Sequence, residues 1–264
     1  MIDYFIVCHD TTIINDTHNF DNLPDHRFLV VGNKYSNLIN KQHIICDQLP
    51  INIEHLPYLC SYTAWYALVS NRLNNHKNIC LLEYDTLLSN SFHIINQQII
   101  NKQNNSQYII GYNKTLTNHY VFLKSTPWLE ISLKKVYNID LIEFTKENHI
   151  SYPYWPTTTN ITTTLDVLEA FKEWFDPMTK LFAHHKLGSY VQERAFFIFC
   201  VMHNIDINHA PKGSLIHDQL QSHKCSDVYG EFLSNQKTNI LDESAKTEYD
   251  SLYNSYKNSI TTTS

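Results

Sequence analysis

The chain has 264 residues, 43% of them hydrophobic, and a formal net charge of -6. This length fits one large α/β domain or two small ones, and the apolar content is sufficient for a core. The net charge is negative, and no basic stripe carries aromatic side chains. Both features argue against a nucleic-acid-binding protein. The low content of glycine (5) and proline (8) argues against a fibrous or disordered chain.

Cysteine use and hydropathy indicate the compartment. The six cysteines form no CxxC pair, and most of them lie in apolar runs. They are Cys8, Cys46, Cys60, Cys80, Cys200 and Cys225. This pattern predicts buried, unpaired thiols in a reducing compartment. The N-terminal residues 1–7 lack the basic region of a signal peptide, and no apolar run approaches the roughly 20 residues of a membrane span. We therefore expect a cytoplasmic protein without a membrane span.

Three short apolar runs open the chain and predict strands of an α/β sheet. They are Tyr4 to Val7, Arg27 to Val31 and Ile44 to Cys46, and small or polar residues follow each of them. Ligands of open α/β sheets bind at the carboxyl ends of the strands. The dinucleotide motif GxGxxG does not follow the first run.

A helix predicted from Leu59 to Asn75 leads into the most informative stretch, Ile79 to Thr86. Its apolar run predicts a buried strand that ends in Glu83 and Asp85. Side chains alternate along an extended chain, so both carboxylates are expected on one side, where they could hold a divalent cation. The alternative is a strand end with two solvated acids.

The remaining elements follow from periodicity and breakers. We expect a weak helix over 90–105, a strand over 107–112, and helices over 128–138 and 139–148. The Pro- and Thr-rich segment 151–160 is either a sugar-binding lip or an ordinary connector. Further helices are predicted from Leu165 to Phe175, ending before Pro177, and from a capping box at Ser189 onward. A short strand near 205–207 and a polar helix over 241–256 complete the chain.

Three of these features occur in an order that resembles the GT-A glycosyltransferases. They are the helix-strand pair that ends in Glu83-Tyr84-Asp85, the late helix with Gln192-Glu193-Arg194, and a histidine near the C-terminus. Glu83 replaces the first Asp of the DXD motif and keeps its carboxylate. The resemblance covers roughly residues 2–225. The members that the chain resembles are uncharacterised viral or bacterial proteins that build glycans. If the protein is viral, the expected compartment is the host cytoplasm.

The resemblance implies a fold and a reaction. The fold would be a Rossmann-type α/β domain over residues 1–264, with a mixed, mostly parallel sheet flanked by helices and 226–264 as a peripheral helical tail. The reaction would move a sugar from a nucleotide-sugar donor, with UDP favoured, to a glycan or other hydroxyl acceptor. Mn²⁺ or Mg²⁺ would be the cofactor and would act as a Lewis acid on the diphosphate.

The resemblance also implies roles for individual residues. Asp85, Glu83 and His217 would be the metal ligands, with His223 as the second choice of histidine. The donor-binding residues would be Val7, His9, Gly32, Asn33, Tyr62 and Glu83. Glu193 would be the base that deprotonates the acceptor hydroxyl. The alternatives are that Tyr62 is a core residue and that Glu193 is a first-turn acid favoured by the helix dipole.

Two other functions remain open at this point. A nucleotidyltransferase would also use carboxylates and a metal, but residues 8–16 lack its Gly-rich, basic phosphate loop. A non-catalytic carbohydrate-binding protein with a degenerate fold is the second alternative. A zinc hydrolase is disfavoured because HExxH and closely spaced Cys/His pairs are missing. The sequence leaves the sugar, the acceptor, the stereochemistry and the oligomeric state open.

Overall fold

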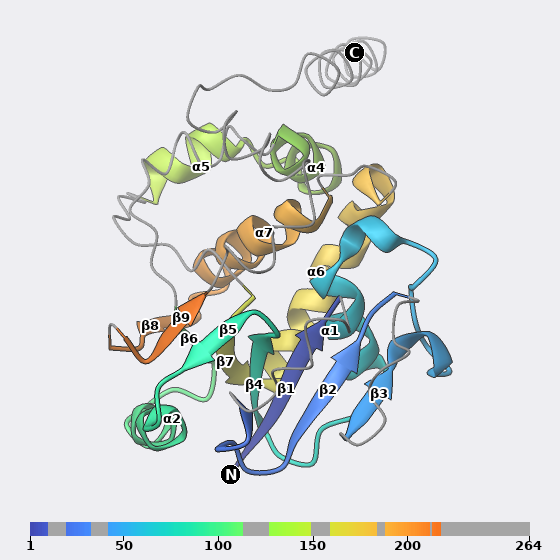
Figure 1. Ribbon diagram of the computed structural model, residues 1–264. Coiled ribbons are helices and arrows are strands. Elements are labelled where there is room, and N and C mark those ends of the chain that lie inside the picture. Colours follow the sequence, from blue (N-terminus) through green and yellow to red (C-terminus); the bar gives the residue numbers. More distant parts are fainter. Residues whose placement is uncertain are drawn as a thin grey trace, which may run out of the picture. The chain divides into compact units, whose positions relative to one another are not determined.

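The computed structural model describes residues 1–9, 20–32, 42–112, 127–148, 159–183, 188–211 and 213–217 (Figure 1). The chain divides into two compact units, one of residues 1–115 and 154–222 and the other of residues 116–153 and 223–264. The single domain predicted over 1–264 stays a prediction, and its tail, 226–264, lies outside the described residues. The first unit contains the sheet and the candidate site.

A seven-stranded sheet in the order β3-β2-β1-β4-β7-β6-β8 forms the centre of the first unit. Its strands are β1 (Ile2–Cys8), β2 (His26–Val30), β3 (His43–Ile45), β4 (Asn78–Glu83), β6 (Tyr108–Gly111), β7 (Ile161–Thr164) and β8 (Asp206–His209). All neighbouring pairs are parallel except those of β7, which runs antiparallel to β4 and to β6. The predicted mixed, mostly parallel sheet is confirmed.

The register brings the carboxyl ends of four strands to one edge. In β1, Val7 pairs with Leu29 of β2 on one side and with Glu83 of β4 on the other. Because β1, β2, β3 and β4 are parallel, the residues that follow them lie along the same edge. This edge therefore gathers the polar strand ends noted in the sequence.

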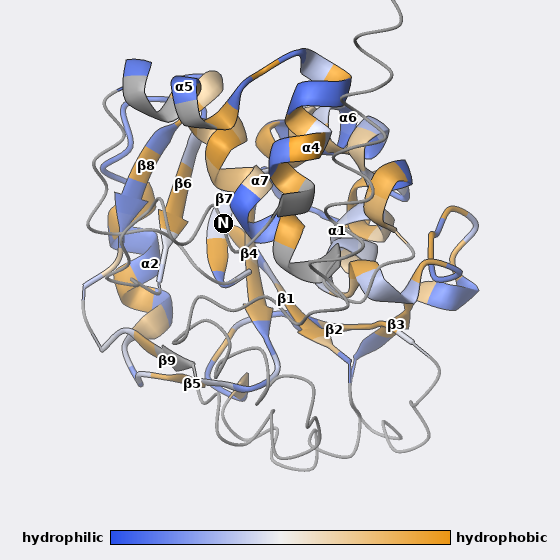
Figure 2. Ribbon diagram, turned by 90° about the horizontal axis from the view of Figure 1, so that it is seen from above, coloured by the Kyte–Doolittle hydropathy of each residue, from blue (hydrophilic) through white to orange (hydrophobic). Residues whose placement is uncertain are grey.

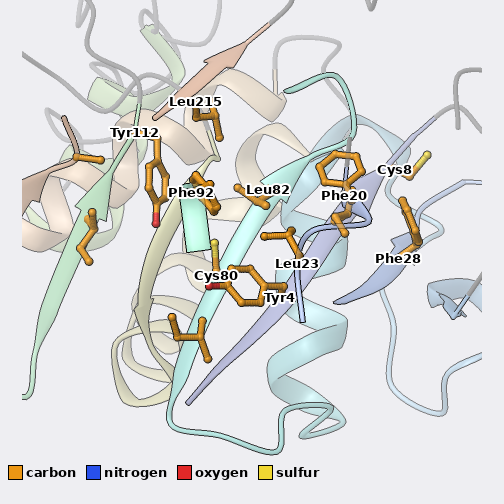
Figure 3. Close-up of a cluster of buried hydrophobic side chains, with 14 of the residues drawn as sticks. Tyr4, Cys8, Phe20, Leu23, Phe28, Cys80, Leu82, Phe92, Tyr112 and Leu215 are labelled. Atoms are coloured by element: carbon orange, nitrogen blue, oxygen red, sulfur yellow. The ribbon is translucent and has the colours of Figure 1, made fainter. Parts of the chain in front are cut away.

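Alternate residues of the strands fill a core on each face of the sheet. On one face, Tyr4, Cys80 and Leu82 pack with Phe92 of α2 (Phe92–Ile100), as Figure 3 shows. Ile6 belongs to the same cluster. The helices α1 (Ser61–Ser70), α6 (Leu165–Phe182) and α7 (Gly188–Met202) lie on the other face (Figure 1). The strands are coloured as largely hydrophobic in Figure 2, as expected for a sheet covered on both faces.

A polar row inside the first core attaches α2 to the sheet. The register places Tyr4, Cys80 and Thr162 side by side on three neighbouring strands. Thr162 Oγ1 accepts a hydrogen bond of 3.0 Å from Asn96 Nδ2 of α2 and lies 2.7 Å from the Tyr112 hydroxyl. Burial raises the pKa of the Cys80 thiol to about 12, so it stays protonated. Hydrogen bonding within the row offsets the cost of burying these groups.

The helices on the opposite face meet through aromatic rings. The Phe171 ring of α6 lies 4.8 Å from that of Phe196 and 5.5 Å from that of Phe199, both on α7. Trp65 of α1 contacts Phe171 and Phe196, at 6.0 and 5.1 Å between centroids. These edge-on contacts form the helical layer that supports the sheet from behind.

The other described elements are short. A two-stranded antiparallel ribbon joins β5 (Thr86–Leu88) to β9 (Leu215–His217). Two single-turn helices, η2 (Cys46–Gln48) and η3 (Pro57–Leu59), lie between β3 and α1. The helices α4 (Pro127–Tyr137) and α5 (Leu141–Glu147) belong to the second unit. Within the described residues, no helix has the length and apolar character needed to cross a bilayer.

Two predicted helix boundaries are wrong. Helix α6 does not end before Pro177 but continues to Phe182. The rings of Phe175 and Phe182 meet at 5.6 Å across the proline, so packing on both sides of it outweighs the lost hydrogen bond. Helix α7 begins at Gly188, so Ser189 lies inside the helix and is not its cap. Glu193 consequently lies beyond the first turn, where the helix dipole has little effect.

Candidate active site

Strand β4 ends at Glu83, and Tyr84 and Asp85 form a turn into β5. The expectation that Glu83 and Asp85 share one side of an extended strand is therefore wrong in its geometry. The turn is fixed by the Tyr84 N–H, which donates to the Val7 carbonyl at 3.0 Å, and by the Thr86 hydroxyl, which donates to the Glu83 carbonyl at 2.7 Å. Asp85 is held in this turn with 9% of its surface exposed.

The Glu83 carboxylate is bound by protein hydroxyl groups. Its Oε1 accepts hydrogen bonds from the hydroxyls of Ser61, at 3.4 Å, and of Thr159. Its backbone N–H donates to Oδ1 of Asn160 at 2.7 Å. Glu83 thus joins the start of α1 and the segment before β7 to the end of β4.

His9 lies next to this group, directly after β1. Its Nε2 is 3.1 Å from the Ser61 hydroxyl, and its ring meets the ring of Tyr84 edge-on at 6.1 Å. Burial lowers the pKa of His9, and the charges of Glu83 and Asp85 act in the opposite direction. Both carboxylates therefore lie within electrostatic reach of the same imidazole.

An unusual backbone conformation precedes Ser61. Cys60, the residue before α1, has φ 44° and ψ -117°, in a region that mainly glycine occupies. The chain turns sharply there, and the following residue, Ser61, presents its hydroxyl to both His9 and Glu83. A strained residue next to a polar cluster is a recurrent feature of functional sites.

The ribbon of β5 and β9 places a histidine backbone beside the turn. His217 is the register partner of Thr86, the residue after Asp85. The side chain of His217 is not among those described, and His223 lies outside the described residues altogether. A carboxylate and an imidazole are suitable ligands for Mn²⁺, and for Mg²⁺ the carboxylate oxygen suffices. A divalent cation held by Asp85 and His217 stays a prediction. In the described part of the chain, no three His, Cys, Asp or Glu side chains form a metal-binding group by themselves.

The predicted donor-binding residues are only partly brought together. Gly32 follows β2 at the same edge as His9, and its φ of 82° explains the glycine. Val7 is fully buried in β1 and therefore supports the site without lining it. Asn33 lies outside the described residues.

Tyr62 does not join the site. It is 1% exposed, its ring lies 4.7 Å from that of Phe175, and its hydroxyl donates to Asp176 of α6. The hydroxyl of Tyr62 therefore helps to attach α1 to α6. This placement matches the alternative reading of Tyr62 as a core residue.

Glu193 lies on α7 beside a buried cation. Its Oε2 is 3.7 Å from Nη1 of Arg194, whose side chain is 2% exposed, while that of Glu193 is 18% exposed. The role of Glu193 as a base stays a prediction.

Sequence reasoning missed several residues of the site. Ser61, Thr159 and Asn160 bind Glu83, but a single hydroxyl or amide carries no recognisable spacing. The hydroxyl-rich segment 151–160, interpreted as a sugar-binding lip or a connector, was the signal that could have drawn attention to Thr159. Residues 151–158 lie outside the described residues.

Comparison with known proteins places this arrangement in a fold family. No family model and no curated protein sequence matches the chain. Among solved structures, the bifunctional glycosyltransferase WbbM superposes with a TM-score of 0.55 at 14% identity over 83% of this chain. The chain has a GT-A-type fold. It spans 45% of the WbbM chain.

Two other solved structures are similar at lower TM-scores. Glucosyl-3-phosphoglycerate synthase from Mycobacterium tuberculosis, solved with Mn²⁺, UDP-glucose and phosphoglyceric acid, has a TM-score of 0.44 at 11% identity, covering 92% of this chain and 81% of its own. The galactosyltransferase LgtC, solved with donor and acceptor sugar analogues, has a TM-score of 0.41 at 10% identity, covering 92% and 99%. These scores are too low to carry an argument about the site of the GT-A-type chain.

Proposed function

We propose that the protein is a metal-dependent glycosyltransferase that moves a sugar from a nucleotide-sugar donor, a UDP-sugar by preference, to a hydroxyl group of a glycan. The observation that carries the proposal is the cluster at the carboxyl edge of β1 and β4, where His9, Ser61, Glu83 and Asp85 converge. A GT-A-type fold alone would not assign the activity, because folds host many functions.

The residues of the cluster take different roles in this proposal. Asp85 and His217 would hold a divalent cation, because the β5–β9 register pairs His217 with Thr86, the residue that follows Asp85. The bound cation would supply Lewis-acid stabilisation of the diphosphate leaving group. That Glu83 is a third metal ligand stays a prediction. Its Oε1 already accepts hydrogen bonds from two hydroxyl groups.

Glu83 also has a second role that follows from its contacts. By binding Ser61 and Thr159 it keeps both hydroxyls at the strand end, where they could bind hydroxyl groups of a donor. His9, with a lowered pKa, is favoured in its neutral form and can donate or accept a hydrogen bond there. Glu193 is proposed as the base that takes the acceptor proton.

A donor screen tests the proposal. The protein is incubated with a panel of nucleotide sugars and Mn²⁺, and release of the nucleoside diphosphate is measured with and without glycan acceptors. We expect slow hydrolysis of one donor class, and faster turnover when a suitable acceptor is present.

Other outcomes of the same screen identify the alternatives. Release of pyrophosphate from a nucleoside triphosphate and a sugar phosphate would indicate a nucleotidyltransferase. A rise in melting temperature with glycans but no turnover of any donor would indicate a carbohydrate-binding protein, since any ligand of the folded state stabilises it. Either result contradicts the proposed function.

A further inference from the structure

Glu54 presents a carboxylate whose two oxygens differ in their partners. Oε2 accepts a hydrogen bond of 2.8 Å from the backbone N–H of Gly32. Oε1 is buried and, among the residues that the structure describes, has no hydrogen-bond partner. The backbone of Glu54 is itself held, because its N–H donates to Oδ1 of Asn52 at 3.2 Å. A fixed, buried acceptor without a donor is costly unless a ligand or an ordered water supplies one.

This carboxylate lies at the same edge of the sheet as the candidate site. Gly32 follows the end of β2, as His9 follows β1 and Glu83 ends β4. In the order β2-β1-β4, two strand spacings separate Gly32 from Glu83, or about 10 Å at ~4.8 Å per spacing. Such a separation matches the length of a nucleoside that extends away from a diphosphate held near Asp85.

The contacts on either side of β4 decide the direction in which a nucleoside extends. On the β7 side, the end of β4 is occupied by Thr159 and Asn160, which bind Glu83. On the β2 side, a Cβ placed on Gly32 would meet no atom of the described residues within 4 Å, so those residues leave the backbone beside the carboxylate open. A nucleoside that extends from Asp85 past His9 would bring its base to Glu54.

We propose that Oε1 of Glu54 accepts the N3–H of a uracil base and thereby selects uridine over cytidine nucleotides. This proposal rests on the proposed function, which supplies the nucleotide. Uracil carries a proton at N3, whereas cytosine presents a lone pair there, which would face the carboxylate oxygen. A site built to accept a hydrogen bond rejects an analogue that lacks the donor.

Equilibrium binding of nucleoside diphosphates in the presence of Mn²⁺ tests the proposal. For the wild-type chain we expect UDP to bind at least about tenfold more tightly than CDP and than N3-methyl-UDP, which lacks only the N3 proton. In Glu54→Gln, the side-chain amide can donate a hydrogen bond to N3 of cytosine. The binding of UDP should therefore weaken, and the preference for UDP over CDP should shrink or reverse. Glu173→Gln makes the same change at an exposed acid of α6 and is the matched control, with the preference unchanged.

The possible failures are distinguishable. If the wild-type chain binds no nucleoside diphosphate, the proposed function fails and the role of Glu54 fails with it. If UDP and N3-methyl-UDP bind equally, or if Glu54→Gln leaves the preference unchanged, only the role of Glu54 is overturned. Relative to UDP, 2′-deoxy-UDP could lose as much affinity as N3-methyl-UDP does, with the loss absent in Glu54→Gln. That result would assign Oε1 to the ribose and overturn base selection. The N3-methyl-UDP measurement uses the wild-type chain and does not depend on the folding of a variant.

Discussion

At the scale of single residues, the hydrogen bonds of each carboxylate indicate its role better than its place in a motif. Glu83 and Asp85 were identified together as a Glu-X-Asp pair, yet Glu83 binds two protein hydroxyls and Asp85 lies in the turn that follows. Glu54 belongs to no motif, and its contact with Gly32 and its buried Oε1 draw attention to it. Sequence spacing could locate the first pair, but it could not distinguish their roles.

Replacing Glu193 by Gln tests the proposed base. If it takes the acceptor proton, kcat for transfer should fall by about 10²–10⁴-fold with little change in the KM for the donor. The exposed Glu173 of α6 offers the matched control, Glu173→Gln, with normal turnover. Glu193→Asp keeps the negative charge beside the buried Arg194, so it separates the loss of a base from a loss of stability. Normal transfer by a folded Glu193→Gln protein would remove Glu193 from the mechanism.

Replacing Cys60 by Gly tests the strain at the start of α1. Because φ 44° and ψ -117° are unfavourable for any residue with a Cβ, we expect the free energy of unfolding to rise by about 1 kcal/mol in urea titrations. Cys60→Ala removes the thiol but keeps the Cβ, so it should bring no such gain. Equal stabilities of the Gly and Ala variants would show that the backbone there is unstrained.

At the scale of elements, strands were predicted more reliably than the ends of helices. Short apolar runs bounded by polar residues located β1, β2, β3, β4 and β6, because buried strands leave a clear apolar pattern. Strand β7 was missed, since its sequence Ile-Thr-Thr-Thr looks polar, although all four residues are buried between β4 and β6. Its Thr162 and Thr163 hydroxyls are hydrogen-bonded, which only the folded sheet reveals.

Pro177 tests the energetics of α6. Pro177→Ala restores a backbone donor in the middle of an 18-residue helix, at an exposed position. After allowing for the greater freedom of the unfolded chain, we expect a rise of about 1–2 kcal/mol in the free energy of unfolding. Pro57 begins η3, where a proline is tolerated, so Pro57→Ala is the control and should bring no gain. A Pro177→Ala variant no more stable than wild type would show that the helix bends around the proline without cost.

At the scale of the whole molecule, the fold class followed from the sequence, whereas the assembly of the site followed only in part. Parallel strands must bring their carboxyl ends together, so His9, Gly32 and Glu83 at one edge could be expected. The pairing of β5 with β9, which sets His217 opposite Thr86, joins segments about 130 residues apart and left no local signal. Long-range pairing of this kind is decided by packing, which a single sequence does not display.

The thiols provide a test that covers the entire chain. Among the described residues, no disulfide joins any two of the cysteines Cys8, Cys46, Cys60, Cys80 and Cys200. We expect six modified thiols when the chain is unfolded with an alkylating reagent and no reductant, and its intact mass is measured. A stoichiometric disulfide would contradict both the expected thiols and the reducing compartment predicted from them.

The central claim is that Asp85, in the turn after β4, forms a metal-dependent site for a nucleotide. Isothermal titration of UDP with and without Mn²⁺ tests it most directly, on the wild-type chain, on Asp85→Asn and on the control Glu173→Gln. We predict that Mn²⁺ tightens UDP binding about tenfold or more in the wild type and in the control, and that this gain is lost in Asp85→Asn while the fold persists. A folded Asp85→Asn protein with an undiminished Mn²⁺ effect on UDP binding would contradict the account.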